Sequence, residues 1–271
     1  MKEKFYRGLY ALCFLGFGIF IFYNQTSWKS DIVRQNDMYE FVRKEIADPS
    51  VFTIEMNAKA YIKDTSIARE MIIPPDNCSA TGRASSFAVK EGGYLLTNKH
   101  TLHIKEEYCM ESILRTAKEK HLKLSRKDVN IETEFTARDG NGNEYPVSVI
   151  AESKNQDLAL LRVIGISPKP LEISERKDIR NEAVAAVGTP FATRNTITYG
   201  NIASDKLKYK RIVVAIPVSP GNSGGPLITL SDGKVFGIMT EVSQVAPGVP
   251  GSIGYAIPAW AILDFLAEAG L

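Results

Sequence analysis

Histidine and cysteine are both scarce in this chain, which contains three of each in 271 residues. The histidines are His100, His103 and His121, and the first two are spaced closely enough to suggest a pair of metal ligands. No further cluster of cysteine, histidine or acidic residues in the sequence completes the four ligands that a zinc site requires. We therefore expect no bound metal, and nothing in the sequence indicates a cofactor.

Net charge is also small, because 33 lysine and arginine residues are nearly balanced by 31 aspartate and glutamate residues, which leaves a formal charge of +2. The charged residues are mixed along the chain rather than gathered into one basic patch. Proteins that bind nucleic acids use such a patch to neutralise phosphates. The sequence therefore argues against nucleic acid as a partner.

A serine flanked by glycines lies near the C-terminal end, in the run Pro-Gly-Asn-Ser-Gly-Gly-Pro-Leu at residues 220–227. Glycine adopts turn conformations that other residues avoid, and it lets a second molecule approach the main chain. A turn of this kind can direct the backbone amides of Gly221 and Ser223 at one point, where they would stabilise an oxyanion. The segment predicts a nucleophilic serine, although a glycine-rich hairpin with an incidental serine would look the same.

A serine hydroxyl needs a base to take its proton and a third group to orient that base. His100 follows a Gly-Gly turn and a short apolar strand, and it stands at the exit of that strand. His103 and His121 instead flank a highly charged stretch that predicts an exposed helix. His100 is therefore the candidate base.

Asp157 is the candidate orienting group, because it directly precedes the apolar run at residues 158–161. A carboxylate that enters a buried environment needs a partner, and a histidine N–H would supply one. An aspartate that merely closes a turn remains an alternative. Asp139 is a weaker candidate because its Asp-Gly-Asn-Gly context is typical of a hairpin turn. The order His100, Asp157, Ser223 is one of three in which unrelated folds place such a triad.

Five short segments together resemble the trypsin-like serine proteases, and within them the HtrA/Deg branch. They comprise residues 93–100, 157–161, 188–191 with 198–200, 220–227 and 254–258, and they span roughly residues 80–262. The resemblance implies an all-β fold of two six-stranded antiparallel barrels, as in chymotrypsin. It also implies a serine endopeptidase in which His100 and Asp157 come from the first barrel and Ser223 from the second.

The same resemblance implies how protein or peptide substrates would bind. The strand at residues 237–242 would pair with the substrate backbone as an added strand, which makes Thr240, Glu241 and Val242 the candidate substrate-binding residues. No acidic residue occurs at positions 213–219, just before the serine loop, so we expect cleavage after small or medium aliphatic side chains. A homotrimer is implied by the resemblance alone.

The chain also departs from that family. We expect a helical insert after His100 that extends to about Lys127, and we expect no PDZ domain after the protease domain. Two alternatives to a peptidase remain: a catalytically silent pseudoprotease that acts as a protein-binding module, and an esterase or acyltransferase that uses the same triad.

The N-terminus carries Lys2, Lys4 and Arg7 before an uncharged, mostly apolar segment at residues 8–23. We interpret residues 1–29 as a cytoplasmic flank and an uncleaved signal anchor; a cleaved signal or a buried helix are the alternatives. The positive flank predicts a cytoplasmic N-terminus and a single-pass cell-membrane protein with its protease domain on the extracytoplasmic side.

The remaining chain predicts a juxtamembrane spacer at residues 30–50, containing a short polar helix, and a protease domain at residues 51–271. A first strand is expected from Val51, and residues 71–82 are expected to form a loop. Cys78 and Cys109 bracket the segment that carries His100. They would stabilise the domain if they paired in an oxidising compartment, but spacing alone leaves that pairing open.

Overall fold

The computed structural model describes residues 34–70, 78–176, 181–190, 193–204, 211–243 and 253–271. The chain divides into two compact units, residues 1–43 and 44–271. In the first unit, residues 34–41 are α-helical and Arg43 pairs with Glu40 at 2.8 Å. Helical structure continues through η1 (Val42–Ala47) and α2 (Asp48–Ser50), so the helix expected in the spacer is confirmed. The boundaries predicted at residues 29 and 50 stay a prediction.

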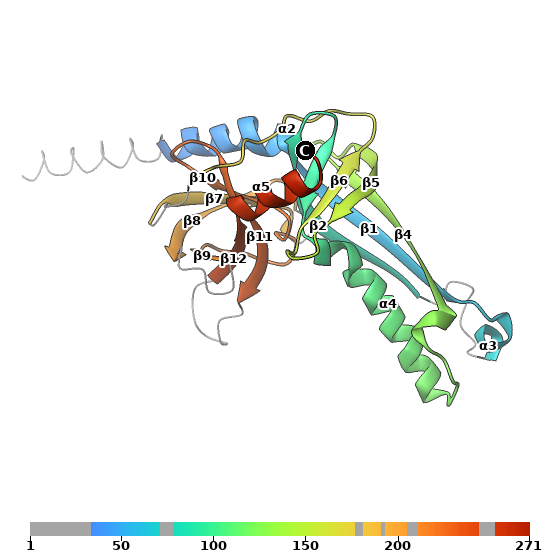
Figure 1. Ribbon diagram of the computed structural model, residues 1–271. Helices are drawn as coiled ribbons and strands as arrows, with labels where there is room; N and C mark the ends of the chain where they lie inside the picture. The colour runs from blue at the N-terminus through green and yellow to red at the C-terminus, as the bar shows by residue number, and fades with distance from the viewer. Residues whose placement is uncertain (1–33, 71–77, 177–180, 191–192, 205–210, 244–252) are drawn as a thin grey trace, which may run out of the picture. The chain divides into compact units, whose positions relative to one another are not determined.

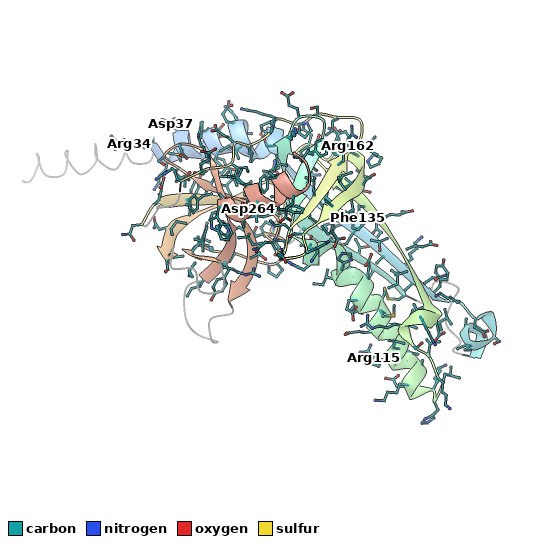
Figure 2. The ribbon with its side chains drawn as sticks, in the orientation of Figure 1. Arg34, Asp37, Arg115, Phe135, Arg162 and Asp264 are labelled. Atoms are coloured by element: carbon teal, nitrogen blue, oxygen red, sulfur yellow. A yellow bond between two sulfur atoms is a disulfide. The ribbon has the colours of Figure 1, made fainter. Side chains whose placement is uncertain are left out.

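The first six strands close into an antiparallel barrel in the order β1-β2-β3-β6-β5-β4 (Figure 1). They are β1 (Val51–Ile62), β2 (Cys78–Lys90), β3 (Tyr94–Thr97), β4 (Val129–Arg138), β5 (Glu144–Glu152) and β6 (Ala159–Val163). Alternate residues of β1, such as Phe52 and Ile54, point inward and pack against Leu95 and Leu161. Figure 2 labels Phe135, which packs against this core, and Arg162, which is exposed on β6.

The next six strands close into a second antiparallel barrel in the order β10-β11-β12-β9-β8-β7. They are β7 (Ala183–Gly188), β8 (Thr196–Ser204), β9 (Ile212–Ala215), β10 (Pro226–Thr229), β11 (Val235–Ser243) and β12 (Ile253–Pro258), followed by α5 (Ala259–Glu268). Its core includes Val184, Ile202, Val214 and Leu227. The expected pair of six-stranded barrels is therefore confirmed.

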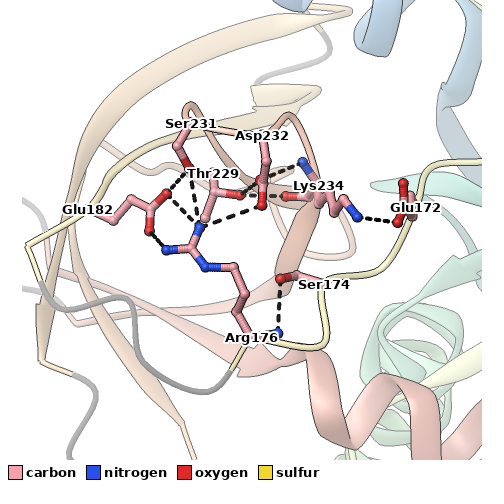
Figure 3. Close-up of polar contacts among 8 residues, drawn as sticks. All are labelled: Glu172, Ser174, Arg176, Glu182, Thr229, Ser231, Asp232 and Lys234. Carbon is pink, nitrogen blue, oxygen red and sulfur yellow. Dashed lines mark hydrogen bonds and ion pairs between the residues drawn. The ribbon is translucent and has the colours of Figure 1, made fainter.

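The segment between the barrels is tied to the β10–β11 hairpin by backbone and side-chain contacts (Figure 3). Ser174 donates its backbone N–H to Val235 O, and Val235 donates its own to Glu172 O, each at 2.8 Å. Arg176 pairs with Glu182 at 2.6 Å and reaches Asp232 at 3.5 Å. These contacts fix the start of the second barrel against the hairpin that leads into β11.

A long helix, α4 (Lys99–Glu119), packs along extended ends of β1 and β2, with α3 (Thr65–Glu70) and η2 (Arg126–Asp128) beyond (Figure 1). The expected helix is present, but it begins before His100, which lies in its first turn. The expectation of an exposed helix is wrong for one face of α4. The helix buries the side chains of Leu102, Met110 and Ile113. Met110 and Ile113 belong to an apolar cluster with residues of β1 and β4.

Cys109 of α4 forms a disulfide with Cys78 at the start of β2, with their Cα atoms 5.4 Å apart. The pairing that the sequence left open is therefore made. Residues 78–82 belong to β2, so the loop expected at 71–82 is wrong for that part, while 71–77 lie outside the described residues. No helix of the described residues is long and apolar enough to cross a membrane. The candidate anchor at residues 8–23 lies outside those residues.

Candidate active site

The serine loop joins β9 to β10 and turns at glycines whose backbone conformation other residues rarely adopt. Gly221 has φ +106° and Gly224 has φ +86°. A side chain at Gly221 would also collide with the carbonyl oxygen of Thr189. The turn is closed by the N–H of Asn222, which donates to Ser219 O at 3.1 Å. Glycine is thus required at Gly221 both by the conformation and by the lack of space.

Ser85 of β2 holds this loop against the first barrel. Its backbone N–H donates to Ser223 O at 2.9 Å, and its hydroxyl donates to Gly221 O at 2.7 Å. The same hydroxyl accepts the N–H of Thr189 at 2.9 Å. Ser85 is fully buried, and its hydrogen bond with the N–H of Thr189 is shielded from water. One buried side chain of the first barrel therefore connects two loops of the second.

The carbonyl groups of Gly221 and Ser223 are thereby occupied, whereas their N–H groups are not. Within the described part of the chain, neither amide donates a hydrogen bond to a protein acceptor. Gly221 and Ser223 are partly exposed and line a cavity, so their N–H groups are accessible to a bound molecule. A pair of open donors separated by one residue is suited to binding an oxygen that carries negative charge.

His100 and Asp157 are directly paired. His100 Nδ1 lies 2.6 Å from Asp157 Oδ2, and the backbone N–H of His100 donates to Asp157 Oδ1 at 2.8 Å. The second contact follows from the position of His100 in the first turn of α4, where backbone N–H groups have no partner within the helix. Asn98 holds the backbone of the aspartate by donating to Asp157 O at 2.9 Å. The carboxylate thus fixes both the ring and the backbone of the histidine.

The carboxylate of Asp157 is also bound by Thr240, whose hydroxyl donates to Oδ2 at 2.8 Å. Burial raises the pKa of Asp157, but the hydrogen bonds from His100 and Thr240 outweigh this effect, and the pKa lies below the ordinary aspartate value. Asp157 is therefore ionised at neutral pH. An ionised carboxylate at Nδ1 leaves Nε2 of His100 as the nitrogen that can accept a proton.

Ser223 lies at the same site, but its hydroxyl takes a different partner. Its Oγ donates to the backbone oxygen of Thr240 at 3.1 Å, and among the described residues no hydrogen bond joins it to His100. Ser223, Gly221 and His100 line one cavity of about 670 Å³. Catalytic hydrogen bonds are often incomplete without substrate and form in its complex. The three sequence-predicted residues thus meet at one site with the His–Asp contact formed.

The candidate substrate strand is β11, which contains Thr240, Glu241 and Val242. The Thr240 side chain is buried and directed at Asp157, and its hydroxyl also accepts a hydrogen bond from Arg211 Nη1 at 3.1 Å. Glu241 and Val242 have defined strand pairing with β12, but their side chains lie outside what the structure describes. Their role as substrate-binding residues stays a prediction.

Two residues of the site were missed from the sequence: Ser85 and Arg211. Neither belongs to a motif, and both act through hydrogen bonds to residues far away in the chain. Among the other candidates, Asp139 accepts backbone N–H groups of Asn141 and Asn143 and closes a hairpin turn, away from His100. The described residues contain no group of three histidine, cysteine or acidic side chains that could hold a metal.

His103 lies one turn along α4 from His100 and binds two carboxylates. Its Nδ1 is 2.8 Å from Glu106 and its Nε2 is 3.0 Å from Glu152 of β5. Partial burial lowers the pKa of His103, but the two glutamates outweigh this and place it above the ordinary histidine value. His103 therefore contributes to the contact between α4 and β5 rather than to the site at Ser223.

Comparison with known proteins gives consistent matches. Residues 84–238 match the model of the trypsin-like peptidase domain. The chain is 30% identical over 197 residues to serine protease HTRA1 of Xenopus tropicalis, which covers 68% of this chain and 35% of that protein. It is 27% identical over 187 residues to a probable periplasmic serine endoprotease DegP-like of Halomonas elongata, which covers 66% of this chain and 33% of that protein.

The fold also matches the crystal structure of the serine endoprotease from Yersinia pestis. The TM-score is 0.57 at 20% identity, and the match covers 86% of this chain and 65% of that one. The chain spans about a third of the length of the curated relatives above. Because the family model covers more than half of the chain, including Ser85, His100, Asp157 and Ser223, the chain belongs to the trypsin-like peptidase family.

Proposed function

We propose that this chain is a serine endopeptidase that hydrolyses peptide bonds of protein or peptide substrates through an acyl-enzyme. The observation that carries the proposal is the pair of His100 and Asp157 at a serine whose loop has two backbone amides that donate to no described residue. The names of the relatives, which are serine proteases and endoproteases, support the same reaction.

In the first half of the reaction, the Ser223 side chain turns from Thr240 O toward His100 by rotation about its Cα–Cβ bond. Ser223 Oγ then forms a bond to the scissile carbonyl carbon while its proton passes to His100 Nε2. The carbonyl oxygen becomes an oxyanion that accepts hydrogen bonds from the N–H groups of Gly221 and Ser223. His100 returns the proton to the leaving nitrogen, and the C–N bond breaks to leave an acyl ester on Ser223.

In the second half, a water molecule gives a proton to His100 Nε2 as its oxygen attacks the ester carbon. The same two amides hold the second oxyanion. The proton then passes from His100 to Ser223 Oγ as the ester bond breaks, which releases the acid and restores the enzyme. Throughout, Asp157 keeps Nδ1 of His100 protonated and stabilises the imidazolium, and Thr240 and the His100 backbone N–H keep Asp157 ionised.

We propose that the bond after a small or medium aliphatic residue is cleaved. The segment before the serine loop supplies buried Ile216 and Val218, and no acidic side chain occurs at residues 213–219. The guanidinium of Arg211, at Thr240, adds a positive charge on this side. A lysine or arginine of the substrate would lose its hydration there without gaining a carboxylate partner.

The proposal is tested by combining Ser223→Ala with a fluorophosphonate probe on the full chain in mild detergent. We expect the wild type to be labelled and to cleave a denatured-protein substrate. Ser223→Ala should take no label and lose cleavage by a factor of about 10⁶ if the three residues act as a unit. Ser79→Ala, an exposed serine of β2, is the matched control and should behave as wild type.

An unlabelled wild type would favour a pseudoprotease, and labelling with turnover of esters alone would favour an esterase. Mapping the cleaved bonds tests the aliphatic preference, which dominant cleavage after lysine or arginine would contradict.

We also propose that residues 8–23 anchor the chain in the cell membrane with the peptidase outside the cytoplasm. The support is the basic flank formed by Lys2, Lys4 and Arg7. Protease added to intact spheroplasts should digest the domain, and protection until the membrane is lysed would contradict the orientation. The homotrimer implied by family resemblance is tested by sedimentation of the detergent-solubilised chain.

A further inference from the structure

The described walls of the cavity at Ser223 extend over the first barrel and α4. Its walls contain Glu55 and Met56 of β1, Thr81, Gly82 and Arg83 of β2, and Thr101, Ile104 and Lys105 of α4, together with His100 and the serine loop. Among the described residues that line it, none belongs to β11. If the substrate residues before the scissile bond pair with β11, this cavity receives the residues after that bond. It is therefore the space into which the leaving amine is released.

Two of the charges in this cavity compensate each other. Glu55 and Arg83 face one another across β1 and β2, and Arg83 Nε lies 2.8 Å from Glu55 Oε2. Arg138 approaches the same carboxylate at 3.5 Å. The Glu55 side chain is 12% exposed, so its charge is held inside this group of arginines. It does not neutralise any cation farther along the cavity wall.

Lys105 is the remaining lysine or arginine among the described residues that line the cavity, and its position is restricted. Its stem lies across Gly82, where an added Cβ would be only 2.9 Å from Lys105 Cγ and 3.1 Å from its Cε. Its ammonium lies 5.8 Å from the centre of the Tyr108 ring. Among the residues that the structure describes, no carboxylate forms an ion pair with Lys105. Lys105 is thus a half-buried cation of this cavity, and no described carboxylate compensates its charge.

Apolar side chains border this lysine on α4. Ile104 is 55% exposed and Tyr108 is 58% exposed, and they lie one helical turn apart. Because Ile104 lines the cavity that contains Ser223, this face of α4 continues directly from the reaction centre. A substrate chain leaving the cavity would pass a cation set among apolar surfaces, where a carboxylate on the substrate gains more than in open water.

We propose that Lys105 is a specificity-determining residue that binds an aspartate or glutamate side chain one to three positions after the scissile bond. The inference rests on the proposed peptidase function and names the side chain preferred on the leaving side. The specificity would come from α4, because the first turns of this helix carry both His100 and Lys105. The enzyme would then select bonds that have an aliphatic residue before them and an acidic residue shortly after them.

The test uses peptide pairs that differ only by aspartate or asparagine at one position after a fixed Val–Ala scissile bond. With the full chain in mild detergent, we expect kcat/KM at low salt to favour the aspartate peptide by about fivefold at the preferred position. The ratio should fall toward one as salt rises, because salt screens exposed pairs. Lys105→Gln should bring the ratio to one, and Lys105→Glu should reverse it. Lys118→Gln, on the same helix but outside this cavity, should keep the wild-type ratio.

The outcomes separate the inference from the function on which it rests. Ser223-dependent cleavage with no aspartate preference in the wild type, or a preference that survives in Lys105→Gln, would overturn the role of Lys105 and leave the peptidase intact. No Ser223-dependent cleavage of any peptide or denatured protein would overturn the proposed function and this inference with it.

Discussion

The two barrels contribute to the active site in different ways. In the first barrel, His100 and Asp157 already make their hydrogen bonds to each other, and Thr240 adds a third from the second barrel. In the second barrel, the serine loop presents two backbone amides that donate to no acceptor among the described residues. In the mechanism that we propose, the first arrangement orients a base, whereas the second keeps donors ready for a charge that appears during the reaction. The comparison separates contacts that are already formed in the fold from donors that the proposal assigns to substrate.

Among the variants that test this comparison, the largest effect is expected from breaking the formed contact with Asp157→Asn. The amide could satisfy the backbone N–H of His100, but it would hold the ring in the wrong tautomer. We expect kcat to fall by about 10⁴ while the fold is kept. Single-turnover kinetics measure the fall in rate, and near-ultraviolet circular dichroism checks that the fold is kept. A variant that stayed within tenfold of wild type would show that Asp157 does not orient the base.

The same substitution should also change how the free energy of unfolding depends on pH. The pKa of Asp157 is depressed in the folded state, so the stability it contributes is present above the unfolded value of about 3.9. That contribution is lost as pH falls through the lower, folded-state pKa. The free energy of unfolding of Asp157→Asn should therefore fall less steeply in acid than that of wild type.

An intermediate effect is expected from Ser85→Ala, which removes the hydroxyl that connects the two barrels at the serine loop. The substitution leaves Gly221 O and the Thr189 N–H without their buried partner, at about 1–3 kcal/mol of stability. If Ser85 also positions the open amides, kcat should fall by about 10²-fold with little change in KM.

Ser86→Ala is the matched control for this experiment. Ser86 is also buried on β2, but its hydroxyl is directed at Phe52 O, at 3.4 Å, and not at the serine loop. A loss of stability in both variants with kcat retained in Ser85→Ala would limit Ser85 to a structural role.

The smallest expected effect is at His103, one turn away from His100 and outside the reaction. Its pKa is raised in the folded state, so its stabilisation is fully present below the unfolded value of about 6.5 and is lost as pH rises through the folded value. The side chain is 47% exposed, which limits the effect to about 0.5 kcal/mol. Urea unfolding of His103→Gln should differ from wild type at pH 5.5 and agree with it at pH 8. An equal difference in the free energy of unfolding at both pH values would show that the charge of His103 does not stabilise the fold.

Much of this site could be predicted from sequence because its chemistry is carried by short local patterns. The glycines around Ser223 are needed for conformations that the loop adopts, and the apolar runs beside His100 and Asp157 form β3 and β6, which pair with each other. The error at α4 has an equally local cause. Charged residues dominate its composition, but its buried residues recur at helical spacing, and they became recognisable only against β1 and β4.

The residue types, their order and the family pattern can be read from the sequence, because turns, strands and nucleophile loops depend on neighbours in the chain. Three contacts are visible only in the folded chain: Cys78 with Cys109, Ser85 with Gly221 and Thr189, and Lys105 with Gly82 at the edge of the cavity. Those contacts join residues brought together by closure of the barrels and packing of α4. Hydrogen bonds and ion pairs act over a few ångströms, so their partners are set by that packing and not by distance along the chain.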